Sequence, residues 1–139
     1  MPTASRSDAA DLPVRPAEEP WTAAELAEVR TELESEAASL RADIAKAAAD
    51  IADRLIDSAK DAGDDEAEAG AKAFEREHEL AVTQNAQDLL EQGERALHRI
   101  DAGTYGVCES CGKPIGKARL LAFPRATLCV ECKQRQERR

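Results

Sequence analysis

Two Cys-x2-Cys pairs lie near the C-terminal end of this 139-residue chain, and they restrict its fold more than any other feature. Cys108 and Cys111 form the first pair, Cys129 and Cys132 form the second, and 17 residues separate the pairs. Each pair places two sulfurs on one tight turn, and four thiolates are the ligand set of a closed tetrahedral zinc site. We therefore predict one structural zinc ion bound by these four residues, with no position left open for water or substrate.

Two other uses of paired cysteines fit the sequence less well. Disulfides need an oxidising compartment, whereas residues 1–16 contain no apolar segment of the kind that directs secretion. A thioredoxin-type redox pair needs a strand followed by a helix and a single Cys-x-x-Cys motif. Gly112 directly follows the first pair, where a tight metal-binding turn often needs a positive φ angle, and its position also favours a metal site.

Composition argues for a thin helical protein. Alanine dominates the apolar residues, and only four aromatic residues are present: Trp21, Phe74, Tyr105 and Phe123. A chain with so few large apolar side chains cannot build a thick core and favours long helical packing. No apolar run approaches the length that spans a bilayer, so we expect a soluble, cytoplasmic protein that does not associate with membranes.

The formal net charge of −9 is unevenly distributed. Residues 1–107 carry 11 basic and 25 acidic side chains, whereas residues 108–139 carry eight basic and three acidic ones. Phosphate repels an acidic surface, so the long acidic segment argues against a sequence-specific DNA-binding protein. The basic end could offset the negative charge of a zinc tetrathiolate or face an acidic partner.

Proline and hydrophobic periodicity divide the chain. Residues 1–20 hold four of the six prolines and show no periodicity, which predicts a disordered arm. Residues 21–113 contain no proline, which leaves room for long helices. Thr22 and Glu25 form a capping-box pattern at the start of the first helix, and Trp21 just before it could form a hydrophobic staple with Leu26.

Apolar residues then recur in steps of three and four, the spacing of a coiled-coil seam. The first stripe comprises Leu26, Val29, Leu33, Ala37, Leu40, Ile44, Ala47, Ile51 and Leu55. The second comprises Phe74, Val82, Ala86, Leu89, Leu90, Gly93, Leu97 and Ile100. Gly103 follows, at a place that suits a left-handed helix C-cap.

These patterns predict a mostly α protein. We expect a long antiparallel coiled-coil hairpin over residues 21–103, with an acidic tip near 61–70, and a four-cysteine zinc finger with a short basic C-terminal helix over 104–139. Parallel dimerisation through the first helix is the alternative. The second stripe favours pairing within one chain, and hence a monomer.

The tip is rich in carboxylates between Asp61 and Glu68, and its main candidates for function are Asp64, Asp65, Glu66 and Glu68. Acidic residues at the start of a helix stabilise its dipole, and charge runs are commonly just solvated. A carboxylate cluster carried on a probe could instead approach a bound magnesium ion or a basic channel. The two interpretations are compatible. Because the sequence has no nucleophile beside a histidine and no glycine-rich phosphate loop, we do not expect an enzyme.

The finger has a distinctive set of residues, namely the lead-in Gly103-Thr-Tyr105-Gly106-Val-Cys108, the two cysteine pairs, and between them Ile115, Arg119 and Pro124. In these residues it resembles the finger of the DksA/TraR family of bacterial RNA-polymerase-binding regulators. With the hairpin included, the resemblance covers about residues 22–135. It implies a protein that binds RNA polymerase directly, inserts its coiled coil into the secondary channel, and alters initiation, often together with the alarmone ppGpp.

The sequence departs from the family pattern at the tip and at the effector positions. Where the family tip reads Asp-x-x-Asp-x-Ala, this chain has Asp65, Glu68 and Gly70, or in a shifted register only Asp65 and Ala67 of the Asp-x-Ala part. The positions aligned with basic effector contacts read Gln92 and Phe123, and Lys133 alone keeps the charge. Because a polyanionic nucleotide loses charge-assisted hydrogen bonds there, we expect weak or absent ppGpp synergy.

Arg119 and Lys133 are the candidate contacts to an effector or to the polymerase. Two other functions remain as alternatives. A transcript-cleavage factor of the Gre type also presents acidic residues on a helical hairpin, but such factors lack a four-cysteine finger. A zinc-ribbon nucleic-acid-binding protein would use the basic residues of the finger, and the acidic arm argues against it.

Overall fold

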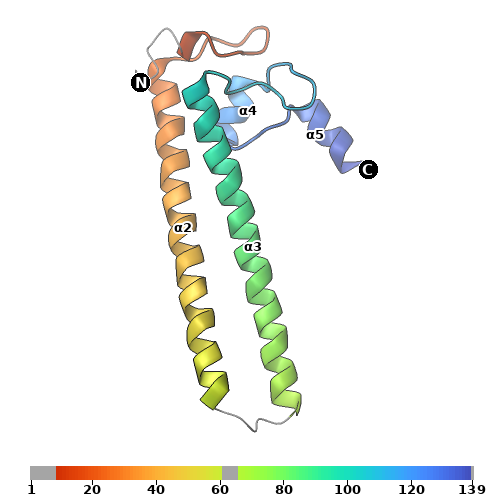
Figure 1. Ribbon diagram of the computed structural model, residues 1–139. Coiled ribbons are helices and arrows are strands. Elements are labelled where there is room, and N and C mark those ends of the chain that lie inside the picture. Colours follow the sequence, from red (N-terminus) through yellow and green to blue (C-terminus); the bar gives the residue numbers. More distant parts are fainter. Residues whose placement is uncertain (1–8, 61–65, 139) are drawn as a thin grey trace. The chain divides into compact units, whose positions relative to one another are not determined.

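The computed structural model describes residues 9–60 and 66–138, without the side chains of residues 58–60 and 66–68. Two long helices form a hairpin, two short helices follow, and no strand forms among the described residues. The predicted mostly helical fold, with a hairpin followed by clustered cysteines, is confirmed. In chain order the helices are α2 (Ala23–Lys60), α3 (Glu66–Ala102), α4 (Lys117–Ala122) and α5 (Val130–Glu137) (Figure 1).

The chain divides into two compact units. The finger unit comprises Met1–Glu36 and Gln92–Arg139, and the hairpin unit comprises Ala37–Glu91. Each long helix contributes one end to the finger unit and the other to the hairpin unit. No helix in the described part of the chain is long and apolar enough to cross a membrane.

The finger unit contains the buried core. The first turns of α2 bury Leu26, Val29 and Leu33, and the last turns of α3 bury Ala96 and Ile100. These side chains pack in one cluster with residues of the N-terminal segment and of the finger, namely Ala9, Leu12, Trp21, Tyr105, Cys108, Ile115, Leu120 and Cys132. The predicted periodicity therefore marks the buried faces of both helices within the finger unit.

The predicted helix start has the expected geometry. The Thr22 hydroxyl accepts a hydrogen bond from the Glu25 backbone N–H at 3.1 Å, and the Glu25 carboxylate accepts one from the Thr22 N–H at 3.0 Å. This reciprocal pair is a capping box, which satisfies two N–H groups that the helix itself cannot. Trp21 is buried, and its ring lies 5.9 Å from that of Tyr105. Trp21 therefore joins the helix start to the finger.

Helix α3 ends as its glycine predicts. Gly103 has a φ angle of 76°, and the N–H groups of Gly103 and Thr104 donate to the carbonyls of Ile100 and Arg99. A residue with positive φ lets the chain leave the helix while its last carbonyls remain bonded. The chain then enters the finger directly.

The hairpin unit has a more polar seam than predicted. Ala47 and Ile51 on α2 are half-buried as expected, but Arg54 on α2 forms an ion pair with Glu79 on α3. Phe74 precedes Glu79 by five residues, which is about 140° around a helix of 3.6 residues per turn. Phe74 therefore points away from the face that meets α2.

Three residues of the predicted stripes are consequently wrong assignments. Phe74 is 73% exposed, Val82 is 57% exposed, and Leu55, the last residue of the first stripe, is 56% exposed. Apolar spacing cannot distinguish a seam residue from one displaced around the helix when few apolar residues define the stripe. The hairpin unit thus leaves several large apolar side chains unused by its own packing.

The prediction of a disordered arm over residues 1–20 is wrong for residues 9–20. Together with Trp21 these residues form the N-terminal strap, residues 9–21. Ala9 and Leu12 are 1% and 5% exposed, and both belong to the core cluster of the finger unit. The prolines here break helical periodicity without preventing burial, because an irregular segment can still pack its isolated apolar side chains. Residues 1–8 lie outside the described residues.

Candidate functional site

The first cysteine pair lies on a tight turn that the backbone holds closed. The Cys108 N–H donates to the Lys113 carbonyl at 2.9 Å, and the Gly112 N–H donates to the Cys108 carbonyl at 3.0 Å. An isolated antiparallel bridge joins Val107 to Pro114. Gly112 has a φ angle of 76°, as its position after the pair predicts. The turn thereby presents both sulfurs on one side.

The second pair lies at the start of α5. Cys129 is the N-cap residue of this helix, and Cys132 is buried in its first turn. The Glu109 N–H donates to the Thr127 carbonyl at 2.9 Å, which ties the second pair's approach to the first turn. The Cys129 N–H also points at the Cys108 sulfur, at 3.4 Å. A helix start and a loop turn thus bring the two pairs together.

The four sulfurs form one compact cluster. All lie within 4.8 Å of one another, and the sulfurs of Cys111 and Cys129 are 3.8 Å apart. A tetrahedral site with zinc–sulfur bonds of about 2.3 Å has sulfurs separated by about 3.8 Å. All four thiols are free of disulfides. The chemistry and spacing of these donors fit one zinc ion, which would take all four as thiolates.

The polypeptide around the cluster favours thiolate at Cys108. Burial raises the pKa of this thiol, but the backbone N–H groups of Cys111, Cys129 and Ser110 outweigh burial and hold the pKa below its usual range. The Arg135 guanidinium lies 4.0 Å from the Cys132 sulfur. Hydrogen bonds and a cation therefore offset part of the negative charge that four thiolates would concentrate here.

Arg119 and Lys133 lie on the same surface of the finger unit. They line a hollow of about 740 Å3 together with Gln92 and Phe123, the two uncharged residues at the aligned effector positions. Arg119 is half-buried, donates from Nε to the Leu128 carbonyl at 3.2 Å, and lies 5.7 Å over the Phe123 ring. Lys133 is exposed. Arg119 thus supports the loop before Cys129, and its predicted contact role remains a prediction.

Of the four tip candidates, Asp64 and Asp65 lie outside the described residues. Glu66 and Glu68 belong to the first turn of α3, but their side chains are also outside the description. Their predicted role remains a prediction. Carboxylates in the first turn of a helix suit its dipole in any case.

Sequence reasoning missed Glu18, and it considered Lys117 only among the basic residues that a nucleic-acid-binding finger would use. Glu18, in the N-terminal strap, accepts hydrogen bonds from the backbone N–H groups of Lys117 and Ala118, both at 3.0 Å. Nothing in the local pattern around Glu18 marks it as a contact to the finger, because the two finger amides that it binds lie about a hundred positions along the chain. The apolar pair Leu12 and Trp21 was the available signal that the strap is ordered.

Comparison with known proteins identifies the finger first. The pattern of the prokaryotic dksA/traR C4-type zinc finger matches residues 103–138. A solved structure, the transcription factor DksA2 from Pseudomonas aeruginosa, is 33% identical with a TM-score of 0.67, and the match covers 84% of this chain and 85% of that one. The chain belongs to the DksA/TraR family. The similarity extends over most of both chains, so it includes the hairpin as well as the finger.

Other similar proteins also carry the names of DksA/TraR family members. A protein from Caulobacter vibrioides named RNA polymerase-binding transcription factor DksA is 41% identical over 75 residues, or 54% of this chain and 53% of that protein. Its namesake from Escherichia coli K12 is 36% identical over 69 residues, or 50% and 46% of the two chains. The chain thus matches about half the length of these curated relatives. A solved structure of the RNA polymerase binding protein and transcriptional regulator Dks from Chlamydia trachomatis has a TM-score of 0.51 at 25% identity, and the match covers 86% of this chain and 94% of that one.

Proposed function

We propose that this protein is a non-enzymatic regulator of transcription initiation that binds bacterial RNA polymerase in the cytoplasm. The hairpin enters the secondary channel of the polymerase, and the acidic residues near its tip act close to the catalytic centre. The zinc-bound finger holds the hairpin ends together. A regulator of this kind works by binding some promoter-complex states more tightly than others, which shifts the populations of those states.

The similarity to DksA2 over most of both chains is the observation that carries this proposal. A finger match alone would suit many zinc-binding proteins, since fingers occur with unrelated partners. The match to DksA2 also includes the long helices, which are the part of the molecule that the proposal requires to enter the channel.

The surface of the hairpin unit also supports a protein partner. Phe74, Leu80 and Val82 on α3 and Leu55 and Ile56 on α2 are all more than half exposed. These side chains are available to contact a protein partner, and their spacing along each helix spreads them over more than one face.

The direct test combines binding with initiation. Purified protein is titrated into RNA polymerase holoenzyme, and abortive products are measured on a promoter with a short-lived open complex. The variant Asp65→Asn with Glu68→Gln should bind the polymerase as the wild type does and change the yield of abortive products. The same pair of charge changes on exposed residues of the helices, Asp43→Asn with Glu91→Gln, serves as the control and should behave as the wild type.

Failure of the wild-type protein to bind the polymerase would refute the proposal. If the protein binds the polymerase but the tip and control variants affect initiation equally, the role of the tip is refuted and RNA polymerase remains the partner. Loss of binding in the tip variant alone would assign these carboxylates to docking.

We further propose that ppGpp adds little to this activity. Arg119 and Lys133 provide cations at the hollow of the finger unit, but Gln92 and Phe123 offer no charge to a polyanion. A ppGpp-dependent change in initiation by the wild-type protein that disappears in Lys133→Ala would contradict this proposal. Replacing the two uncharged residues with Lys and Arg should create a ppGpp response, since each adds a charge-assisted hydrogen bond.

The two alternative functions, transcript cleavage and nucleic-acid binding, predict different experimental results. A Gre-type factor would accelerate RNA cleavage in backtracked elongation complexes, and we expect no acceleration. A nucleic-acid-binding finger would bind free duplex DNA with an affinity that falls steeply with salt. We expect no such binding, because residues 1–107, which include the long arm, carry 25 acidic and 11 basic side chains.

A further inference from the structure

The N-terminal strap is packed onto the finger instead of extending from it. Leu12 and Trp21 are buried in the same cluster as Ile115 and Leu120, which flank and form α4. Leu120 is 0% exposed. The strap therefore covers apolar residues that the small finger could not bury by itself.

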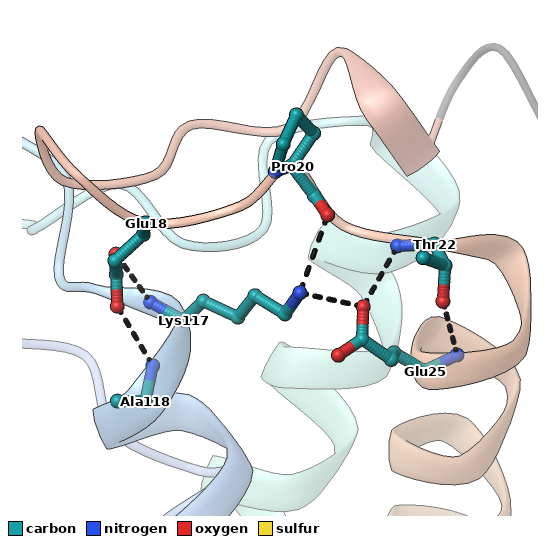
Figure 2. Close-up of polar contacts among 6 residues, drawn as sticks. All are labelled: Glu18, Pro20, Thr22, Glu25, Lys117 and Ala118. Carbon is teal, nitrogen blue, oxygen red and sulfur yellow. Dashed lines mark hydrogen bonds and ion pairs between the residues drawn. The ribbon is translucent and has the colours of Figure 1, made fainter.

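The carboxylate of Glu18 binds the strap to the finger. Glu18 accepts hydrogen bonds from the N–H groups of Lys117 and Ala118, one at each carboxylate oxygen (Figure 2). It accepts a third from the Arg15 N–H at 2.7 Å. Partial desolvation raises the pKa of Glu18, but these backbone hydrogen bonds outweigh it and lower the pKa from its usual value. The bonds are charge-assisted, and such bonds are stronger than neutral ones.

Lys117 fastens the end of the strap and the start of α2. Its ammonium lies 2.6 Å from the Glu25 carboxylate and donates to the Pro20 carbonyl at 3.2 Å (Figure 2). It also lies 5.9 Å from the centre of the Trp21 ring. The Lys117 side chain is 12% exposed. One finger residue thus contacts the strap, the indole and the capping box of α2.

The finger backbone is shaped for close approach of the strap. A Cβ atom at Gly116 would lie 2.9 Å from Cδ of Arg15, and one at Gly106 would lie 3.6 Å from the Pro13 carbonyl oxygen. Both glycines have positive φ angles, 110° and 95°. The strap and the finger therefore meet through a fitted surface as well as through Glu18.

The residues that receive the strap are held by the metal-binding turn. The Ile115 N–H donates to the Gly106 carbonyl at 2.8 Å, and the Cys108 N–H donates to the Lys113 carbonyl. In so small a module, metal-binding energy is folding energy. The surface that accepts Glu18 is thus ordered by the same turn that carries the first cysteine pair.

We propose that the N-terminal strap is a latch whose docking is linked to zinc. It closes on the finger when zinc is bound, opens when zinc is lost, and when closed it slows the loss of zinc. Linkage is reciprocal: whatever factor zinc contributes to docking of the strap, docking contributes to zinc affinity. The occupancy of the metal site is thereby transmitted to the start of α2, about a hundred positions away in the sequence.

The test uses the full-length zinc-loaded protein and does not involve the polymerase. Trp21 is the single tryptophan of the chain, so its emission reports the strap. EDTA removes zinc while a colorimetric chelator assay measures release and tryptophan emission is recorded. Zinc loss and a red shift of Trp21 emission should proceed together. The variant Glu18→Gln should bind zinc about fivefold more weakly or worse, the lower range of ordinary coupling between two sites.

Glu19→Gln is the matched control, because Glu19 is exposed and takes no part in the bonds of Glu18. It should keep wild-type zinc affinity. A second variant, Lys117→Met, removes the ammonium and should also weaken zinc binding. Circular dichroism at 222 nm checks that each variant folds. An emission spectrum of Trp21 that is unchanged after complete zinc removal would overturn the proposal. So would zinc affinities of Glu18→Gln and Lys117→Met that match that of Glu19→Gln.

Discussion

Replacing Leu33 with alanine tests how strongly the finger unit depends on the first turns of α2. Leu33 is 1% exposed and packs in the cluster that contains Val29 and Ile100. Truncating a fully buried leucine removes its transfer energy and leaves a cavity, which together cost about 3 to 5 kcal/mol. We take the lower value and a shift of about 4–8 °C per kcal/mol, which applies to a domain of about 60–100 residues such as the finger unit. The midpoint for thermal unfolding should then fall by roughly 12–24 °C.

Leu80→Ala is the matched comparison, because the chemical change is the same and the side chain is 57% exposed. Exposed truncations of this kind usually change the free energy of unfolding by less than about 0.5 kcal/mol. Both variants are melted by circular dichroism at 222 nm at one free zinc concentration, since bound metal stabilises the folded state. Equal losses in the two variants, or a loss below about 1 kcal/mol for Leu33→Ala, would refute the assignment of the core to the finger unit.

Three further predictions concern single contacts. Cys111→Ser should lower bound zinc from one equivalent per chain, measured by atomic emission, because it removes one of four clustered thiolates. Thr22→Ala should cost about 1 kcal/mol of unfolding free energy through loss of the capping box, whereas Thr31→Ala should be near neutral in the same melts, since that hydroxyl only bonds back to the Ala27 carbonyl inside the helix. Gly116→Ala, at φ 110° and ψ 131°, should cost about 1–3 kcal/mol and exceed the loss in Gly103→Ala, which has a φ of 76° and open space around it; equal losses would contradict the role of the close approach at Gly116.

The sequence predicts well those features that depend on residues close together in the chain. Cys108 and Cys111 are three residues apart, and the turn between them needs only Gly112 and local backbone hydrogen bonds. Thr22 and Glu25 likewise complete their capping box within one helical turn. Because spacing and chemistry determine such features together, they can be recognised before any fold is known.

In the hairpin unit, apolar periodicity predicts the buried face of each helix poorly. Ala47 and Ile51 have the predicted face, but Phe74 and Val82 do not. Where α2 and α3 meet through an Arg54–Glu79 ion pair, the seam has too few apolar residues to show which face of each helix is buried. The face that each helix presents is then set by its partner, which a single helix sequence does not specify.

The sequence alone predicts the helical class, each Cys-x2-Cys turn, the start of α2 and the end of α3, since each depends on residues within a few positions of one another. Tertiary structure decided that the strap is ordered, that Glu18 binds the amides of Lys117 and Ala118, and that Arg119 supports the loop before Cys129. The physical reason is distance along the chain. A carboxylate and an amide about a hundred positions apart leave no repeating pattern, and only the packed cluster around Trp21 brings them within 3.0 Å.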